Sequence, residues 1–264
     1  MPETLETGRV VVPNGQQIPP QKPFYKRFGR SIFYGISIVV ALAIYFGVQQ
    51  NVQGADLQNI RTAELFGFAA LLYLYAALLI SPLYFVFPKT PFRGVALYLR
   101  RAIGISTFIF AFFHAYISFF DLLQGFVGLP FLGDRQIVDM WMTALALLIL
   151  FLMAATSFDY FFVKMGKWWG RLHRFVYLAG TIILVHIITI GSHFTNLTRT
   201  TPIIVMTFIF GLLALQSFRF ATLLEKKTNG KIARRIVLSV CLFVLLAAYF
   251  YILFIAKSAS IHRH

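Results

Sequence analysis

The chain has 264 residues, of which 59% are hydrophobic, 17% aromatic and only 12% charged, about half the charged fraction of a typical soluble domain. Its 24 Lys and Arg against 9 Asp and Glu give a net charge of +15, but so apolar a composition excludes a nucleic-acid-binding protein. The single cysteine, Cys241, excludes a disulfide framework and a cysteine-ligated metal site. Together these features predict an all-α, polytopic membrane protein.

The predicted membrane-spanning segments are seven apolar stretches without Asp, Glu, Lys or Arg, each close to the ~20 residues that cross a bilayer as a helix. In chain order they are Ile32–Val48, Leu65–Phe87, Ala102–Phe120, Met140–Phe158, Phe175–Phe194, Pro202–Phe218 and Ile236–Ala256. The segment 1–31 before them is polar and rich in Pro and Gln, so we expect a flexible N-terminus. The sequence therefore predicts a bundle of about seven transmembrane helices.

The basic residues are divided unevenly between alternate loops of this bundle. The N-terminus and every second loop hold 19 of the 24 Lys and Arg, and the other connections and the tail hold 5. Because cytoplasmic loops are enriched in Lys and Arg, we expect a cytoplasmic N-terminus and an external C-terminus. The predicted location is the plasma (inner) membrane, with the lipid bilayer as the first partner.

Three histidines lie in or beside the predicted spans, where ionisable side chains are costly and mark functional sites. His114 and His186 each lie about 20 Å, measured along their helices, from the basic ends of their spans. Two imidazoles at one level on different helices are what bis-histidine ligation of haem iron requires. The alternative is that each histidine only forms a hydrogen bond with a neighbouring helix.

His173 precedes His186 by 13 residues, about 20 Å toward the basic side, which suits a second haem. On a straight helix the two side chains would face different sides, so a shared face requires a bulge or local unwinding. The residue at the matching level below His114 is Arg100, which does not ligate iron. Arg101 and Arg174 lie where haem propionates would need cations, although positive-inside anchoring also explains them.

Local sequence motifs carry a resemblance to a known family. The runs RRAIGI at 100–105 and FHAY at 113–116 resemble span three of the ferric-reductase-like transmembrane family. The run GKWWGRLHRFVYLA at 166–179, followed by His186, is most similar to the haem-binding membrane subunits of bacterial methionine-sulfoxide reductase systems. The resemblance covers 60–218, leaving 32–59 as an extra first helix with its loop and 219–264 as a basic loop, an extra last helix and a short tail.

The resemblance implies a b-type cytochrome with one or two haem groups. It assigns His114 and His186 to the outer haem and His173 to the inner, cytoplasmic-side position. It implies electron transfer from a separate cytoplasmic-side donor, quinol or reduced flavin, to an external acceptor such as a periplasmic methionine-sulfoxide reductase. FMN or quinone as a bound cofactor stays open, and no complete catalytic site is expected. The alternatives are a transmembrane ferric reductase component and, in another class, a non-redox transporter or scaffold.

Overall fold

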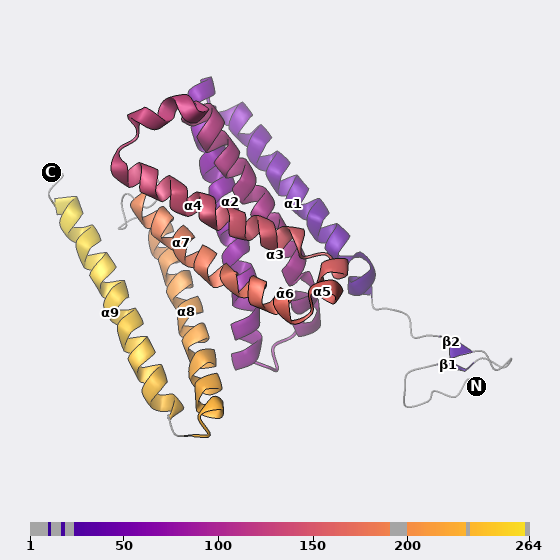
Figure 1. The fold of residues 1–264 in the computed structure, drawn as a ribbon. Helices are drawn as coiled ribbons and strands as arrows, with labels where there is room; N and C mark the ends of the chain where they lie inside the picture. The colour runs from indigo at the N-terminus through magenta and orange to yellow at the C-terminus, as the bar shows by residue number, and fades with distance from the viewer. Residues whose placement is uncertain (1–9, 12–16, 19–23, 191–199, 231–232, 262–264) are drawn as a thin grey trace.

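The computed structural model describes residues 10–11, 17–18, 24–190, 200–230 and 233–261. Nine α-helices make up most of the described chain (Figure 1). They are α1 Phe24–Asn51, α2 Ala55–Val86, α3 Arg93–Tyr116, α4 Asp134–Ala155, α5 Asp159–Met165, α6 Lys167–Leu172, α7 Val176–Thr189, α8 Thr200–Lys227 and α9 Arg234–Ile261. The all-α prediction is confirmed for these residues, apart from a two-residue antiparallel pair, β1 Val10–Val11 and β2 Gln17–Ile18.

Three short helical segments of other types interrupt or join the α-helices. A π-helical segment, η1 Ile117–Leu122, continues α3, and a 3₁₀ helix, η2 Gly125–Phe131, leads toward α4. A second 3₁₀ turn, η3 His173–Phe175, joins α6 to α7. The chain therefore changes helix type at His173, where the sequence indicated local unwinding.

Six helical runs in the described residues are long and apolar enough to cross a membrane. They are α1, α2, α3 with η1, α4, α6 through α7, and Pro202–Lys227 of α8. The first six predicted spans each correspond to one of these runs. The seventh, Ile236–Ala256, falls within α9, which is not among the six. The count of seven and the orientation of the termini therefore stay predictions.

Helix α1 begins earlier than the first predicted span. It starts at Phe24, so the last residues of the segment 1–31 form its first turns and are not an extended leader. The hydroxyl of Tyr98 on α3 donates to the Lys26 carbonyl oxygen at 2.7 Å, and the Arg30 guanidinium lies 4.5 Å from the centre of the Tyr98 ring. These contacts order a basic turn that apolarity alone does not identify. Residues 1–9, 12–16 and 19–23 lie outside the described part, so their flexibility stays a prediction.

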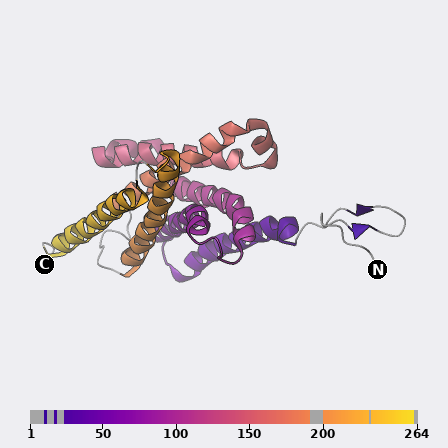
Figure 2. The same ribbon diagram turned by 90° about the horizontal axis from the view of Figure 1, so that it is seen from below.

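Helix α2 is the central helix of the bundle, and half of its most apolar stretch is buried. It contributes Leu74 to a core shared with Ile149 of α4, Ala179 of α7 and Ile209 of α8. The buried hydroxyl of Tyr75 on α2 donates to the Gly180 carbonyl oxygen of α7 at 3.1 Å. Such packing and interhelical hydrogen bonds hold membrane helices together, because lipid gives no hydrophobic drive for their association. Helices α1 and α9 lie at opposite edges, with α2 between them (Figures 1 and 2).

The basic residues gather at one end of the bundle. This basic end comprises the start of α1, the α2–α3 connection, helices α5 and α6, the end of α8 and the start of α9 (Figure 1). The carboxylate of Asp159 connects α5 to two other helices of this end, because it accepts hydrogen bonds from Arg101 of α3 at 2.7 Å and from Arg30 of α1 at 3.5 Å. The opposite end holds the α1–α2 connection, the end of α3, the start of α4 and the end of α7.

Candidate functional site

The two histidines of the predicted pair lie near the end of the bundle opposite the basic end. His114 is two residues before the end of α3, and His186 is three residues before the end of α7. The first part of α2 contacts His114, and the first part of α4 contacts His186. Four helix termini thus meet around the pair, which we call the histidine site.

His114 is fixed against α2. Its Nδ1 lies 2.7 Å from the carbonyl oxygen of Ala63. A carbonyl oxygen can only accept, so Nδ1 carries the proton, and in a neutral ring Nε2 then keeps the lone pair. The ring also lies over Gly67, where an added Cβ would be 2.8 Å from Nδ1. Helix α2 therefore accommodates this imidazole only because residue 67 has no side chain.

His186 is fixed against α4. Its Nδ1 lies 2.7 Å from Oδ2 of Asp139. The Thr189 hydroxyl lies 3.3 Å from Oδ1 of the same carboxylate but nearer, at 3.0 Å, to the Val185 carbonyl oxygen of its own helix. The side chains of His186 and Asp139 are 24% and 13% exposed. The carboxylate oxygen accepts the hydrogen bond from Nδ1–H, and in a neutral ring Nε2 then keeps the lone pair. Histidines that bind metals commonly have such a carboxylate or carbonyl partner on the other ring nitrogen.

The two imidazoles lie beside each other, with ring centroids 6.3 Å apart and ring planes at 68°. In the described part of the chain, neither Nε2 has a hydrogen-bond partner. Metal–imidazole bonds of about 2 Å put two coordinating nitrogens on one metal about 4 Å apart. Each ring centroid is set back from its nitrogen, so a centroid separation of 6.3 Å is close to that of two imidazoles bound through facing Nε2 atoms to one metal ion.

The residues that the structure describes offer this ion no further cluster of ligands. Within the described residues, no group of three or more His, Cys, Asp or Glu is arranged to hold a metal. A metal between His114 and His186 would therefore have to bring its remaining ligands with it. A porphyrin does so, since it fills the four equatorial positions and leaves two axial positions for imidazoles. The donor set thus fits a haem better than a bare ion.

His173, the third predicted haem ligand, does not lie beside this pair. His173 lies at the basic end, where its ring stacks on Trp169 with centroids 3.8 Å apart. Its Nδ1 donates to the Trp169 carbonyl oxygen at 3.0 Å, and its Nε2 lies 3.5 Å from the Ser157 hydroxyl oxygen. That hydroxyl donates to Met153 at the shorter distance of 2.6 Å. No second imidazole accompanies His173 in the described chain.

The two arginines of the prediction also lie at the basic end. The guanidinium of Arg101 is bound to Asp159 and lies 5.2 Å from the centre of the Trp169 ring that stacks on His173. Arg174 is exposed, and no hydrogen bond or ion pair engages its side chain within the described residues. Arg100 donates to the Ser81 hydroxyl at 2.7 Å, so it is tied to α2. His193, His262 and His264 lie outside the described residues.

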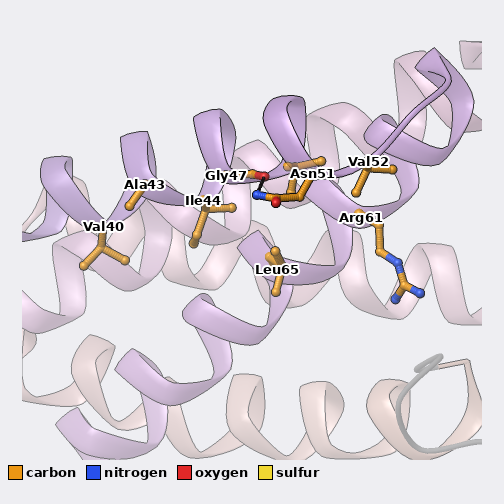
Figure 3. Close-up of a pocket in the computed structure, with 9 residues that line it drawn as sticks. Val40, Ala43, Ile44, Gly47, Asn51, Val52, Arg61 and Leu65 are labelled. Atoms are coloured by element: carbon orange, nitrogen blue, oxygen red, sulfur yellow. Dashed lines mark hydrogen bonds between the residues drawn. The ribbon is translucent and has the colours of Figure 1, made fainter.

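A groove lies between α1 and α2 (Figure 3). Its volume is about 510 Å³, and its walls are mostly aliphatic side chains such as Ile44 and Leu65. Its two polar side chains are both engaged, because Asn51 donates to the Gly47 carbonyl oxygen at 2.8 Å and Arg61 pairs with Glu64 at 2.7 Å. Without convergent polar groups or a metal ligand, this groove is no candidate for the chemistry.

Sequence reasoning missed the partners of both histidines. Asp139 comes directly before the apolar run that begins at Met140, so it reads as an acid of a solvated loop. The structure starts α4 at Asp134, which puts Asp139 more than one turn inside the helix. The predicted span limits, Met140 and Phe194, left Asp139 outside the membrane-spanning segment and gave no signal that it meets His186. Ala63 and Gly67 gave no signal, since a backbone oxygen and a missing side chain have no sequence signature.

The fold and the site define a polytopic helical membrane protein with paired imidazoles near one end of its bundle. The family model of the ferric reductase like transmembrane component matches residues 66–185, which include His114 and His173 and stop one residue before His186. No solved structure matches the chain.

Curated relatives define the family more closely. The protein-methionine-sulfoxide reductase heme-binding subunit MsrQ of Enterobacter sp. (strain 638) is 32% identical over 157 residues, which are 58% of this chain and 74% of the relative. The subunit of the same name from Pasteurella multocida is 32% identical over 123 residues, 46% of this chain and 56% of the relative. The chain belongs to this family of ferric-reductase-like membrane subunits.

Proposed function

We propose that the chain is a membrane haem-binding electron-transfer subunit, in which His114 and His186 bind the iron of one b-type haem through Nε2. The observation that carries the proposal is the pair of imidazoles 6.3 Å apart, each with Nδ1 occupied and Nε2 without a partner in the described residues. When bound, the haem supplies one-electron redox chemistry that no side chain here can supply. A purely structural role for the histidines would account for the two Nδ1 bonds but not for the adjacency of the rings.

The residues of the chain have distinct tasks in this proposal. His114 and His186 supply the axial nitrogens from two different helices, so the helix packing sets their separation. The Ala63 carbonyl oxygen and the Asp139 carboxylate keep the protons on Nδ1 and prevent the rings from turning. Gly67 gives the His114 ring its place against α2.

The uneven distribution of Lys and Arg supports an orientation of the chain in the membrane. If the basic end is cytoplasmic, the histidine site lies in the outer half of the bilayer. We propose that electrons enter from a separate cytoplasmic-side donor, quinol or reduced flavin, and leave to an external acceptor. The name of the relatives makes a periplasmic methionine-sulfoxide reductase the proposed acceptor. Direct reduction of ferric iron is the second candidate, which the name of the matching family model favours.

A second haem belongs to the proposal through His173. Its ligand would be His173, and its propionates would pair with Arg101 and Arg174. Arg174 is exposed and available for this role, whereas Arg101 would have to release Asp159. No second imidazole lies beside His173 in the described chain, so the other axial ligand would come from a different group.

The experiment that tests the function uses the full chain purified in detergent. A dithionite-reduced minus oxidised spectrum should contain a sharp b-type α-band, and a pyridine haemochrome assay gives the haem-to-protein ratio. A ratio of one supports the histidine site alone, and a ratio of two supports a further haem at His173. A colourless protein that haemin cannot reconstitute would overturn the proposal and leave a non-redox transporter or scaffold.

A further inference from the structure

The two histidines of the site have chemically unequal partners. His114 donates its Nδ1 proton to a neutral backbone carbonyl oxygen, that of Ala63. His186 donates its Nδ1 proton to a carboxylate oxygen, that of Asp139, at the same distance of 2.7 Å. A hydrogen bond to an anion transfers more electron density to the ring than a hydrogen bond to a neutral acceptor.

The charge of Asp139 is directed to His186 alone. In the described residues, no Lys or Arg forms an ion pair with it, and its only other partner is the neutral hydroxyl of Thr189. Its side chain is 13% exposed, within a helix that is apolar enough to cross the membrane. An anion in such a place is costly unless it has a partner, and a low dielectric environment strengthens its effect on that partner.

We propose that Asp139 is a positioning residue that makes His186 the more electron-donating of two unequal axial ligands and thereby lowers the reduction potential of the haem. This inference rests on the proposed function. The carboxylate holds the His186 ring with Nε2 available for the iron and increases the basicity of that nitrogen. A more basic ligand and a nearby negative charge both stabilise ferric over ferrous iron, since the ferric site carries one more positive charge. The low potential favours onward donation of the electron to an acceptor.

The test compares the potentiometric titration of the wild-type haem protein with that of Asp139→Asn. The Asn side chain keeps a hydrogen-bond acceptor of the same shape but removes the charge. We expect haem to be retained, and at a fixed potential the ratio of reduced to oxidised haem should rise tenfold or more, which is about 59 mV for one electron. The matched control is Asp134→Asn, which removes the same charge from an exposed position in the first turn of α4. The control should titrate like the wild type.

The outcomes separate this inference from the proposed function. If the wild type binds no haem, the proposed function fails first. If Asp139→Asn binds haem with the potential of the wild type and of the control, Asp139 is only a helix–helix contact and the inference is overturned.

A loss of haem in Asp139→Asn is resolved by a second variant and a second readout. Haem binding at the wild-type potential in Asp139→Glu, together with a thermal unfolding curve of haem-free Asp139→Asn that matches the haem-free wild type, supports the positioning role. An unfolded Asp139→Asn, or a haem-binding Asp139→Glu with the shifted potential, would contradict it.

Discussion

The two ends of the bundle use histidine in different ways. At the histidine site, each ring donates to a different helix, across 51 residues for His114 and 47 residues for His186. At the basic end, the Nδ1 of His173 bonds to the carbonyl oxygen of Trp169, only four residues earlier in the same helical run. Tertiary contacts thus orient the first two rings, whereas local structure orients the third.

This difference favours the histidine site over the basic end as the proposed haem site. Ligands for a single iron must be held at a fixed separation from separate elements, and among the described residues the histidine site alone has such an arrangement. His173 instead belongs to a stack with Trp169, whose ring centre also lies 5.2 Å from the Arg101 guanidinium. That stack holds α3 against α6 and accounts for its residues without a cofactor.

His114→Ala and His186→Ala test the difference between the two ends most directly and should have the largest effect. We expect either change to lower the haem-to-protein ratio of the histidine site about tenfold or more, because one imidazole cannot hold six-coordinate iron. The measurement is the pyridine haemochrome assay on monodisperse protein. The double variant should lose no more haem than either single variant, since the two ligands act as a unit. Variants that keep the full wild-type spectrum would show that these histidines only connect helices.

Gly67→Ala should have the next largest effect. The new Cβ would lie 2.8 Å from Nδ1 and 3.0 Å from Cε1 of His114, so the ring must leave its bond to the Ala63 carbonyl oxygen. We expect a loss of about tenfold in haem affinity and a decrease in the free energy of unfolding of about 1–3 kcal/mol.

Haemin titration of the haem-free protein measures this affinity. The matched control is Gly104→Ala on α3, where an added Cβ meets nothing within 4 Å. If Gly67→Ala bound haemin as tightly as this control, the fixed place of His114 against α2 would not matter for the site.

The proximity of the histidine pair could be predicted from the sequence, but its surroundings could not. Counting residues from the basic boundary of each span put His114 and His186 at one level, and the structure brings their rings to 6.3 Å. Level says nothing about rotation around the helix axis, which packing decides. The predicted span limits followed the apolar runs, so the fourth span was expected to begin at Met140. Asp139 was therefore left out of the predicted site.

The basic end shows a second limit of sequence reasoning. The sequence predicts that Arg100, Arg101 and Arg174 lie on the basic side of the bundle, and charge alone assigns them to propionates or to anchoring. The structure separates them, because Ser81 and Asp159 engage Arg100 and Arg101 while Arg174 is exposed. Asp159 follows the fourth predicted span directly, and pairing it with two arginines requires the tertiary packing of α1, α3 and α5.

His173→Ala should have an intermediate effect on haem content and stability, and it tests whether the two ends are independent. We expect partial loss of haem at most, with the histidine site unaffected, because His173 lies about 20 Å from His186 along the helix axis. Loss of the ring stack with Trp169 should lower the free energy of unfolding by about 1 kcal/mol. The haem ratio and thermal unfolding in detergent measure the two effects.

A matched variant, His173→Phe, separates the roles of ring and nitrogen. It retains a ring that can stack on Trp169 but cannot ligate iron, so its stability should be close to that of the wild type. A lower haem ratio in both variants would identify His173 as a ligand, and complete loss of haem in either would contradict the independence of the two ends.

The smallest expected effect is that of Asp159→Asn at the basic end. The Asp159 side chain is 74% exposed, so water screens its two ion pairs even though the Arg101 side chain is only 22% exposed. We expect the free energy of unfolding to fall by about 0.5–1 kcal/mol, and the loss should shrink at high salt as screening increases. The haem spectrum should not change, because the carboxylate belongs to the basic end and not to the histidine site.

The control for removing one charge is Asp121→Asn, an exposed acid beyond the opposite end of α3, and its stability should equal that of the wild type. A change in the reduction potential for Asp159→Asn but not for the control would mean that the basic end is electrically coupled to the haem, and the division between the two ends would then be wrong.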